Sequence, residues 1–186
     1  MSVLIPEEAF TQGVLDKVFH DRLIADLDRL SGKAGIPPKY VWTSLASYCS
    51  EKDIQWVRRM RSGEDQGLIY TGTNYSIPVE DKMMAIAGAC LRNYINAKML
   101  PVRSIISGLQ NDTLPSPTVM LVPNFCMPKS DGSSVAPWES ASLLGWLYSR
   151  LAQSKKTVLY VGDMNTLEDV YGEAMARHLK AHYTII

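Results

Sequence analysis

Apolar residues recur every three or four positions along the first thirty residues, and charged residues occupy the positions between them. This spacing predicts an amphipathic helix over residues 6–30. The segment 35–40, Gly35-Ile36-Pro37-Pro38-Lys39-Tyr40, then predicts an extended link, because proline fixes its own φ angle and disfavours helix at the residue before it. We therefore divide the chain into an N-terminal helical extension, 1–34, and a core domain, 35–186.

Short apolar runs alternate with stretches of helical periodicity in the core domain. Strands are predicted at 67–72, 102–106, 117–123, 157–162 and 182–186. Helices are predicted at 51–61, 80–99, 138–151 and 167–179. Unbroken apolar strands that alternate with helices are typical of a parallel sheet covered on both faces. The predicted fold class is therefore α/β, in which ligands bind beyond the carboxyl ends of the strands.

Composition and charge narrow the function classes. Hydrophobic residues make up 46% of the chain, and 19 basic residues balance 19 acidic ones, so only a local basic patch could attract nucleic acid. The three cysteines are widely spaced and suggest neither a metal site nor a disulfide framework. No apolar run reaches the roughly 20 residues that span a bilayer, and Glu7 and Glu8 replace the positive charge of a signal peptide. We expect a cytoplasmic protein without a membrane partner.

Three segments resemble parts of one family in their order and spacing. They are Gly35-Ile36-Pro37-Pro38-Lys39-Tyr40, the strand at 67–72 with the helix after it, and Arg150 with 157–165 and 172–179. The family is the AAA+ replicative helicase loaders of the DnaC, DnaI and IstB types, and the chain resembles a phage-type member. The resemblance covers 35–186. It implies a P-loop NTPase-like parallel sheet flanked by helices.

The segment that resembles the P-loop lacks the residues that would bind ATP. The working motif, GxxxxGK[ST], holds phosphates and magnesium with backbone N–H groups, a lysine and a hydroxyl. After Gly72 there is no second glycine, Pro78 removes a backbone donor, and Lys82 comes about one helical turn too late. Pro123 and Asn124 follow the strand that should end in paired aspartates. We predict a degenerate nucleotide site with no catalytic residue, no metal and no cofactor.

In this family the segment before the core domain binds the replicative helicase. The resemblance therefore implies a non-catalytic replication accessory protein that binds a hexameric replicative helicase and helps to load it on DNA. The helicase-binding residues would be Val14, Leu15, Phe19, Leu23 and Leu27, which share one face of the predicted N-terminal helix. An equal alternative is that this apolar face folds back on the core domain.

Single-stranded DNA and self-association are further candidate interactions. Arg58, Arg59 and Arg103 are candidates for phosphate contacts, although a solvated helix face explains such arginines equally well. Arg177 lies in the stretch that resembles the arginine finger and is the candidate for a contact between subunits.

Two other functions stay open on the sequence. One is an ATPase with an unorthodox site built from Lys82 and from Asp163, which follows the strand at 157–162. The other is an inhibitor that captures a host helicase or loader.

Overall fold

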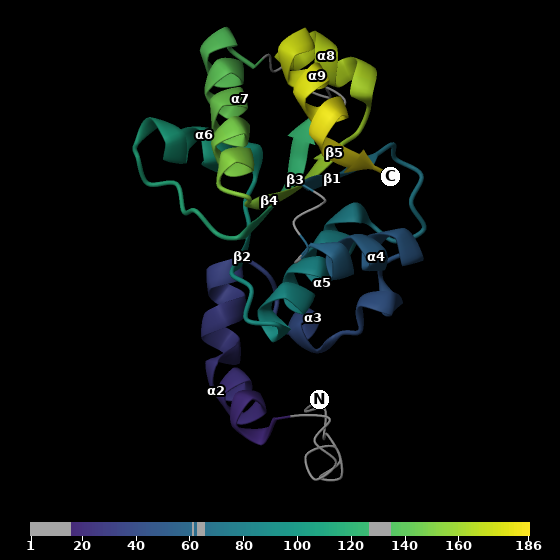
Figure 1. The fold of residues 1–186 in the computed structure, drawn as a ribbon, viewed down its shortest axis with the longest axis vertical. Coiled ribbons are helices and arrows are strands. Elements are labelled where there is room, and N and C mark those ends of the chain that lie inside the picture. Colours follow the sequence, from purple (N-terminus) through teal and green to yellow (C-terminus); the bar gives the residue numbers. More distant parts are fainter. Residues whose placement is uncertain (1–15, 61, 63–65, 127–134) are drawn as a thin grey trace.

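Five parallel strands form one sheet at the centre of the molecule (Figure 1). In this computed structural model, which describes residues 16–60, 62, 66–126 and 135–186, the strand order is β2-β3-β4-β1-β5. The strands are β1 (Gly67–Thr71), β2 (Ala97–Met99), β3 (Val119–Cys126), β4 (Lys156–Val161) and β5 (Tyr183–Ile185). The prediction of an α/β fold with a parallel sheet is therefore confirmed.

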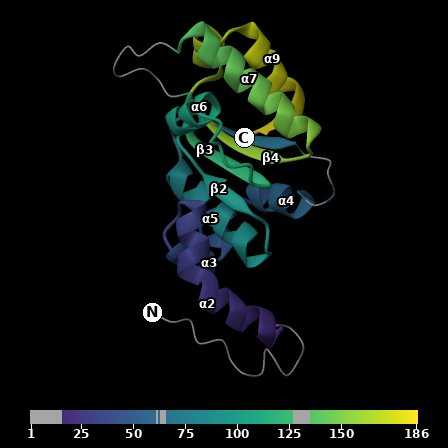
Figure 2. The same cartoon turned by 90° about the vertical axis from the view of Figure 1, so that its left-hand side faces the viewer.

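Helices cover both faces of the sheet, as Figures 1 and 2 show. One face carries α3 (Lys39–Trp42), a 3₁₀ turn (Leu45–Ser47), α4 (Glu51–Arg59) and α5 (Val79–Arg92). The other face carries α6 (Val102–Gln110), α7 (Pro137–Ala152), α8 (Met164–Tyr171) and α9 (Glu173–His182). The N-terminal helix α2 (Lys17–Ala34) projects from the first group beside β2. Among the helices described, none is long and apolar enough to cross a membrane.

The strands contribute to two apolar cores, because successive side chains of a strand point to opposite faces of the sheet. In β1, Leu68 and Tyr70 belong to the core beneath α4 and α5, whereas Ile69 belongs to the core beneath α7 and α9. In β4, Val158 and Leu159 divide between the two cores in the same way. All five side chains are fully buried. Burial on both faces explains why these strands are unbroken apolar runs in the sequence.

The helix α2 and the link after it differ from the prediction. Residues 6–15 of the predicted helix lie outside the described residues. The helix begins after Asp16, whose carboxylate accepts hydrogen bonds from two backbone N–H groups of the first turn, and it ends at Gly35, which has a φ of 74°. The prediction of an extended link over 35–40 is wrong in its last part. The helix α3 begins at Lys39, directly after Pro38, whose φ of −54° suits the start of a helix.

The helix α3 packs closely on α5. A Cβ atom at Gly88 would lie 2.0 Å from the carbonyl oxygen of Tyr40, so the two backbones can approach only because this residue is glycine. The Tyr40 hydroxyl donates to the Asp81 carboxylate, and Arg92 donates to the carbonyl of Val41. The segment that carries the first family resemblance is therefore held against the helix that follows β1.

Three predicted elements are wrong. The helix predicted over 80–99 ends at Arg92, and 97–99 instead form β2, because they hydrogen-bond to β3 far along the chain. The strand predicted at 102–106 is the helix α6, and the side chain of Asn124 accepts a hydrogen bond from its first N–H group at 3.1 Å. The helix predicted over 167–179 is divided into α8 and α9 by Gly172, which has a φ of 87°.

His178 on α9 is buried without a hydrogen-bond partner. Its side chain is 3% exposed, neither ring nitrogen has a partner, and its ring packs against Tyr148 and His182. Burial, and secondarily the charge of His182, lower the pKa of His178 below its usual value. A neutral imidazole is therefore favoured in the folded protein.

Stability should consequently fall as the pH drops below about 6.5. Below pH 6.5 the unfolded chain binds a proton at His178, whereas the folded chain keeps this imidazole neutral. The stability that the neutral His178 contributes is therefore complete above about pH 6.5. It decreases as the pH falls toward the lower pKa of the folded state. Urea unfolding at about pH 7.5 and about pH 5.5 measures the loss. His178→Leu should flatten this part of the profile, and an unchanged profile in that variant would contradict the assignment.

Candidate functional site

The candidate site is the loop between the end of β1 and the first residue of α5. It lies at the carboxyl end of β1, between β4 and β5 in the sheet. Gly72 has a φ of 84°, and its N–H donates to the carbonyl of Gly162 at the end of β4, at 3.0 Å. Pro78 immediately precedes α5 and provides no side-chain cap for the helix. Gly72 and Pro78 therefore bound a loop with the chain position of a P-loop.

Tyr75 folds back from this loop over the ends of β1 and β5. Its hydroxyl lies within hydrogen-bond distance of the carbonyl oxygens of Thr71, at 2.5 Å, and Ile186, at 3.1 Å. Its ring meets the Tyr70 ring edge-on, with the centroids 6.1 Å apart. Burial raises the pKa of Tyr75, so the hydroxyl stays a neutral donor. An aromatic side chain thus anchors a loop whose counterpart in a P-loop wraps around phosphate.

Lys82 points toward α4. Its ammonium lies 4.0 Å from a carboxylate oxygen of Asp53 and 4.7 Å from the centroid of the Tyr75 ring. The Lys82 side chain is 12% exposed, and that of Asp53 is completely buried. Lys82 is therefore enclosed between a carboxylate and an aromatic ring, the usual partners of a buried cation.

Asp53 holds this cluster together. Its carboxylate accepts hydrogen bonds from the backbone N–H of Ser50 at 2.6 Å, the Ser50 hydroxyl at 2.8 Å and the Tyr70 hydroxyl at 2.8 Å. Burial and the charge of Asp53 raise the pKa of Tyr70, and burial raises that of Cys49 to about 12. The sequence interpretation missed Asp53. The Ser-x-x-Asp spacing predicts a helix cap, but it does not reveal that this carboxylate is buried beneath a loop.

The other residues of the predicted degenerate site have structural roles. Pro123 and Asn124 lie inside β3, and the Asn124 side chain caps α6. Asp163 caps α8 by accepting hydrogen bonds from the N–H groups of Asn165 and Thr166 and from the Thr166 hydroxyl. These bonds lower the pKa of Asp163. In the described parts of the chain, no group of three or more His, Cys, Asp or Glu side chains could hold a metal ion.

The predicted helicase-binding residues divide into different environments. Val14 and Leu15 lie outside the described residues. Phe19 is 53% exposed, but Leu23 is only 6% exposed and Leu27 packs against the core beneath α5. Leu23 is therefore buried and Leu27 partly buried in this structure, and their role in partner binding stays a prediction. The large apolar side chains that α2 exposes are Val18, Phe19 and Ile24.

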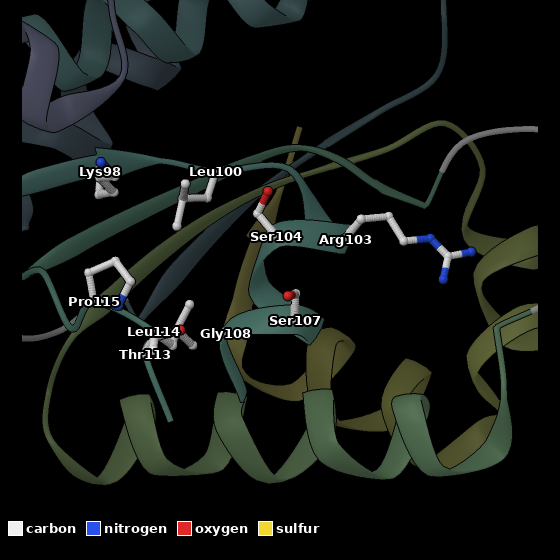
Figure 3. Close-up of a pocket in the computed structure, with 9 residues that line it drawn as sticks. All are labelled: Lys98, Leu100, Arg103, Ser104, Ser107, Gly108, Thr113, Leu114 and Pro115. Atoms are coloured by element: carbon white, nitrogen blue, oxygen red, sulfur yellow. The ribbon is translucent and has the colours of Figure 1, made fainter. Parts of the chain in front are cut away.

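The predicted DNA-binding arginines do not come together. Arg58 and Arg59 end α4 on one face of the sheet, and Arg103 lies on α6 on the opposite face. Arg103 lines an open cavity of about 510 Å³, in which Figure 3 shows its guanidinium directed away from the other lining side chains. That guanidinium is 3.1 Å from the carboxylate of Glu139. These three arginines therefore form no common surface for phosphates.

Arg177, the predicted subunit contact, is exposed on α9. Its guanidinium pairs with the carboxylate of Glu173 one turn earlier, at 2.5 Å. Both side chains are more than two-thirds exposed, and such a pair adds little to stability. Arg177 is therefore accessible for a contact with another molecule.

Comparison with known proteins shows the fold. No protein-family model and no curated protein matches the sequence significantly. The solved DnaC helicase loader has a TM-score of 0.58 and 12% identity, over 79% of this chain and 97% of that one. DnaI has a TM-score of 0.58 and 14% identity, over 81% of this chain and 93% of DnaI. AMPPCP-bound DnaA from Aquifex aeolicus has a TM-score of 0.58 and 10% identity, over 81% of this chain but 50% of DnaA. The fold is therefore the AAA+ type of P-loop NTPase-like fold.

Proposed function

We propose that this chain is a replication accessory protein that binds a hexameric replicative helicase and helps to load it on DNA without hydrolysing ATP. The fold is that of the DnaC helicase loader and DnaI over about four-fifths of this chain. The observation that carries the non-catalytic part is the position of Lys82, enclosed between Asp53 and Tyr75. A phosphate-binding lysine must instead reach the β- and γ-phosphates.

The same positions weaken the case for an unorthodox ATPase. Lys82 and Asp163 were the two side chains available to that alternative, and each already has partners within the fold. Pro123 and Asn124, which lie within β3, also provide no carboxylate for magnesium. Phosphoryl transfer depends on positioned cations, so the loss of the lysine and of the magnesium ligands removes its main source of charge stabilisation.

Millimolar Mg-ATP is expected to leave the melting temperature of the protein unchanged to within about 1 °C. A nucleotide that binds the folded state at 100 times its Kd would add about 2.7 kcal/mol and raise the melting temperature by roughly 5–10 °C in a chain of this size. Differential scanning fluorimetry with ATP, ADP and magnesium measures the shift. A rise of several degrees that depends on magnesium would favour the ATPase alternative.

Helicase binding is proposed to depend on the exposed end of α2. Phe19 is 53% exposed, and its ring packs on that of Tyr94, 5.5 Å away between centroids, which fixes its position on the surface. Preorganised aromatic side chains of this kind dominate many interfaces. The proposed contact surface is therefore Phe19 with its neighbours Val18 and Ile24.

Phe19→Ala should weaken binding to the purified replicative helicase of the host by about 2–3 kcal/mol, or roughly 30- to 150-fold in Kd. Trp138→Ala is the matched control, because Trp138 is a similarly exposed aromatic residue on the opposite side of the sheet. Fluorescence anisotropy with the full chain gives the Kd values, and equal losses in both variants would contradict the assignment. An unwinding assay on coated single strands then separates a loader, which raises activity, from an inhibitor, which lowers it.

A further inference from the structure

A cavity of about 270 Å³ opens between α2 and the turn that joins α5 to β2. Its apolar lining comes from Leu30 on α2, Leu91 at the end of α5, and Ile95 and Ala97 before and in β2. Tyr94 forms one wall. This volume lies just below the roughly 300–1,000 Å³ of sites for small molecules. The cavity therefore suits one or two aliphatic side chains rather than a nucleotide.

The cavity is continuous with the exposed end of α2. Tyr94, which is 51% exposed, lines the cavity and also packs on Phe19. The Tyr94 hydroxyl donates to the carbonyl of Phe19 at 2.7 Å, so the aromatic pair is held in place. The distance along α2 from Phe19 to Lys33 is about 21 Å at 1.5 Å per residue. This surface is long enough for about four turns of a partner helix.

Two basic residues of α2 line one side of the cavity. Arg29 and Lys33 are exposed on its rim, and the ammonium of Lys98 donates to the carbonyl of Lys33 at 2.5 Å. The carboxylate of Asp26 pairs with the guanidinium of Arg29 at 2.8 Å. No carboxylate is among the described residues that line the cavity. The surface is therefore complementary to an acidic segment with apolar anchors.

We infer that this cavity receives an aliphatic side chain from an acidic amphipathic helix of the partner, with carboxylates one turn away facing Arg29 and Lys33. The inference rests on the proposed function and specifies which feature of the helicase the protein would recognise. The apolar anchor supplies affinity. The rim charges accelerate encounter and make binding depend on salt.

Two variants test the cavity without removing Phe19. Asn96→Trp places a large side chain at the mouth of the cavity, where Asn96 is exposed. The expected result is a Kd for the purified helicase about tenfold or more above that of the wild type, with an unchanged melting temperature. Arg29→Glu/Lys33→Glu should raise the Kd about tenfold at 0.05 M salt and less than about threefold at 1 M, where screening is nearly complete.

Lys52→Glu/Arg58→Glu provides the control for the rim variant. It changes the net charge equally but lies on α4, away from the cavity, and the measurement is made without DNA. If the wild type binds the helicase and both test variants bind it with the same affinity, the inference is overturned and the proposed function stands. No binding by the wild type would overturn both. Self-association of the wild type that Asn96→Trp abolishes, with helicase binding unchanged, would assign the cavity to a second copy and overturn the inference.

Discussion

Replacing Asp53 with alanine is expected to lower the free energy of unfolding by about 3–5 kcal/mol, the range for removing one partner of a buried ion pair. The substitution leaves the largely buried Lys82 ammonium without its counter-charge and the buried Tyr70 hydroxyl without an acceptor. It also removes the cap that Asp53 and Ser50 form at the start of α4. Thermal unfolding should show a drop of about 6–20 °C in a chain of this size.

Two controls separate the cluster from general effects of mutation. Glu51→Ala alters an exposed acidic residue in the same helical turn and should cost less than about 1 kcal/mol. The triple variant Asp53→Leu/Lys82→Met/Tyr70→Phe replaces the polar groups together, so it should recover at least half of the loss. A loss in Asp53→Ala no larger than that in Glu51→Ala would show that the cluster does not hold the loop and α4 in place.

Replacing Arg150 with methionine should cost about 3 kcal/mol, mainly through backbone carbonyls that lose their donors. Arg150 is 3% exposed, and its guanidinium donates to the carbonyls of Pro117, Thr118 and Lys156 and to the hydroxyl of Thr157. Burial lowers the pKa of Arg150 to about 10, so the side chain stays charged near neutral pH. It joins the last turn of α7 to the starts of β3 and β4.

Urea unfolding measures the cost at Arg150, and two substitutions test its cause. Arg150→Lys should also lose most of the stability, because an ammonium cannot reproduce a planar group with several fixed donors. Arg103→Met, at an arginine with one partly exposed ion pair, should cost less than about 1 kcal/mol. A full rescue by Arg150→Lys would show that charge, rather than the geometry of the donors, is what the site requires.

The position of Arg150 also bears on its predicted family role. In the sequence it belongs to a stretch that resembles one with sensor residues and an arginine finger. In the structure its hydrogen-bonding groups are directed to the protein's own backbone, and Arg177 is the exposed arginine of that stretch. Of these two arginines, Arg177 is the one exposed for a contact between subunits, and that assignment stays a prediction.

The sequence alone located the central strands of the sheet and showed that the usual nucleotide-binding residues do not follow Gly72. The central strands could be located because burial on both faces requires unbroken apolar runs such as 67–72 and 157–162. The P-loop residues that bind phosphate and magnesium are defined by side-chain identity at fixed positions, so their absence after Gly72 is visible without coordinates. The short strand β2 and the helix α6 could not be predicted, because each depends on hydrogen bonds to β3, more than twenty residues away.

Only the tertiary structure decided what takes the place of the missing residues. Lys82 meets Asp53 across 29 residues of sequence, and Tyr75 meets Ile186 across 111, contacts that no local pattern specifies. The surroundings of α2 were also decided only by the tertiary structure. An apolar stripe at helical spacing has the same sequence pattern in a helix that binds a partner and in a helix that packs on its own core. The helix α2 packs beside α5 and β2, and in this arrangement Leu23 is buried, Leu27 is partly buried and Phe19 is exposed, because a helix buries only the side that faces its neighbours.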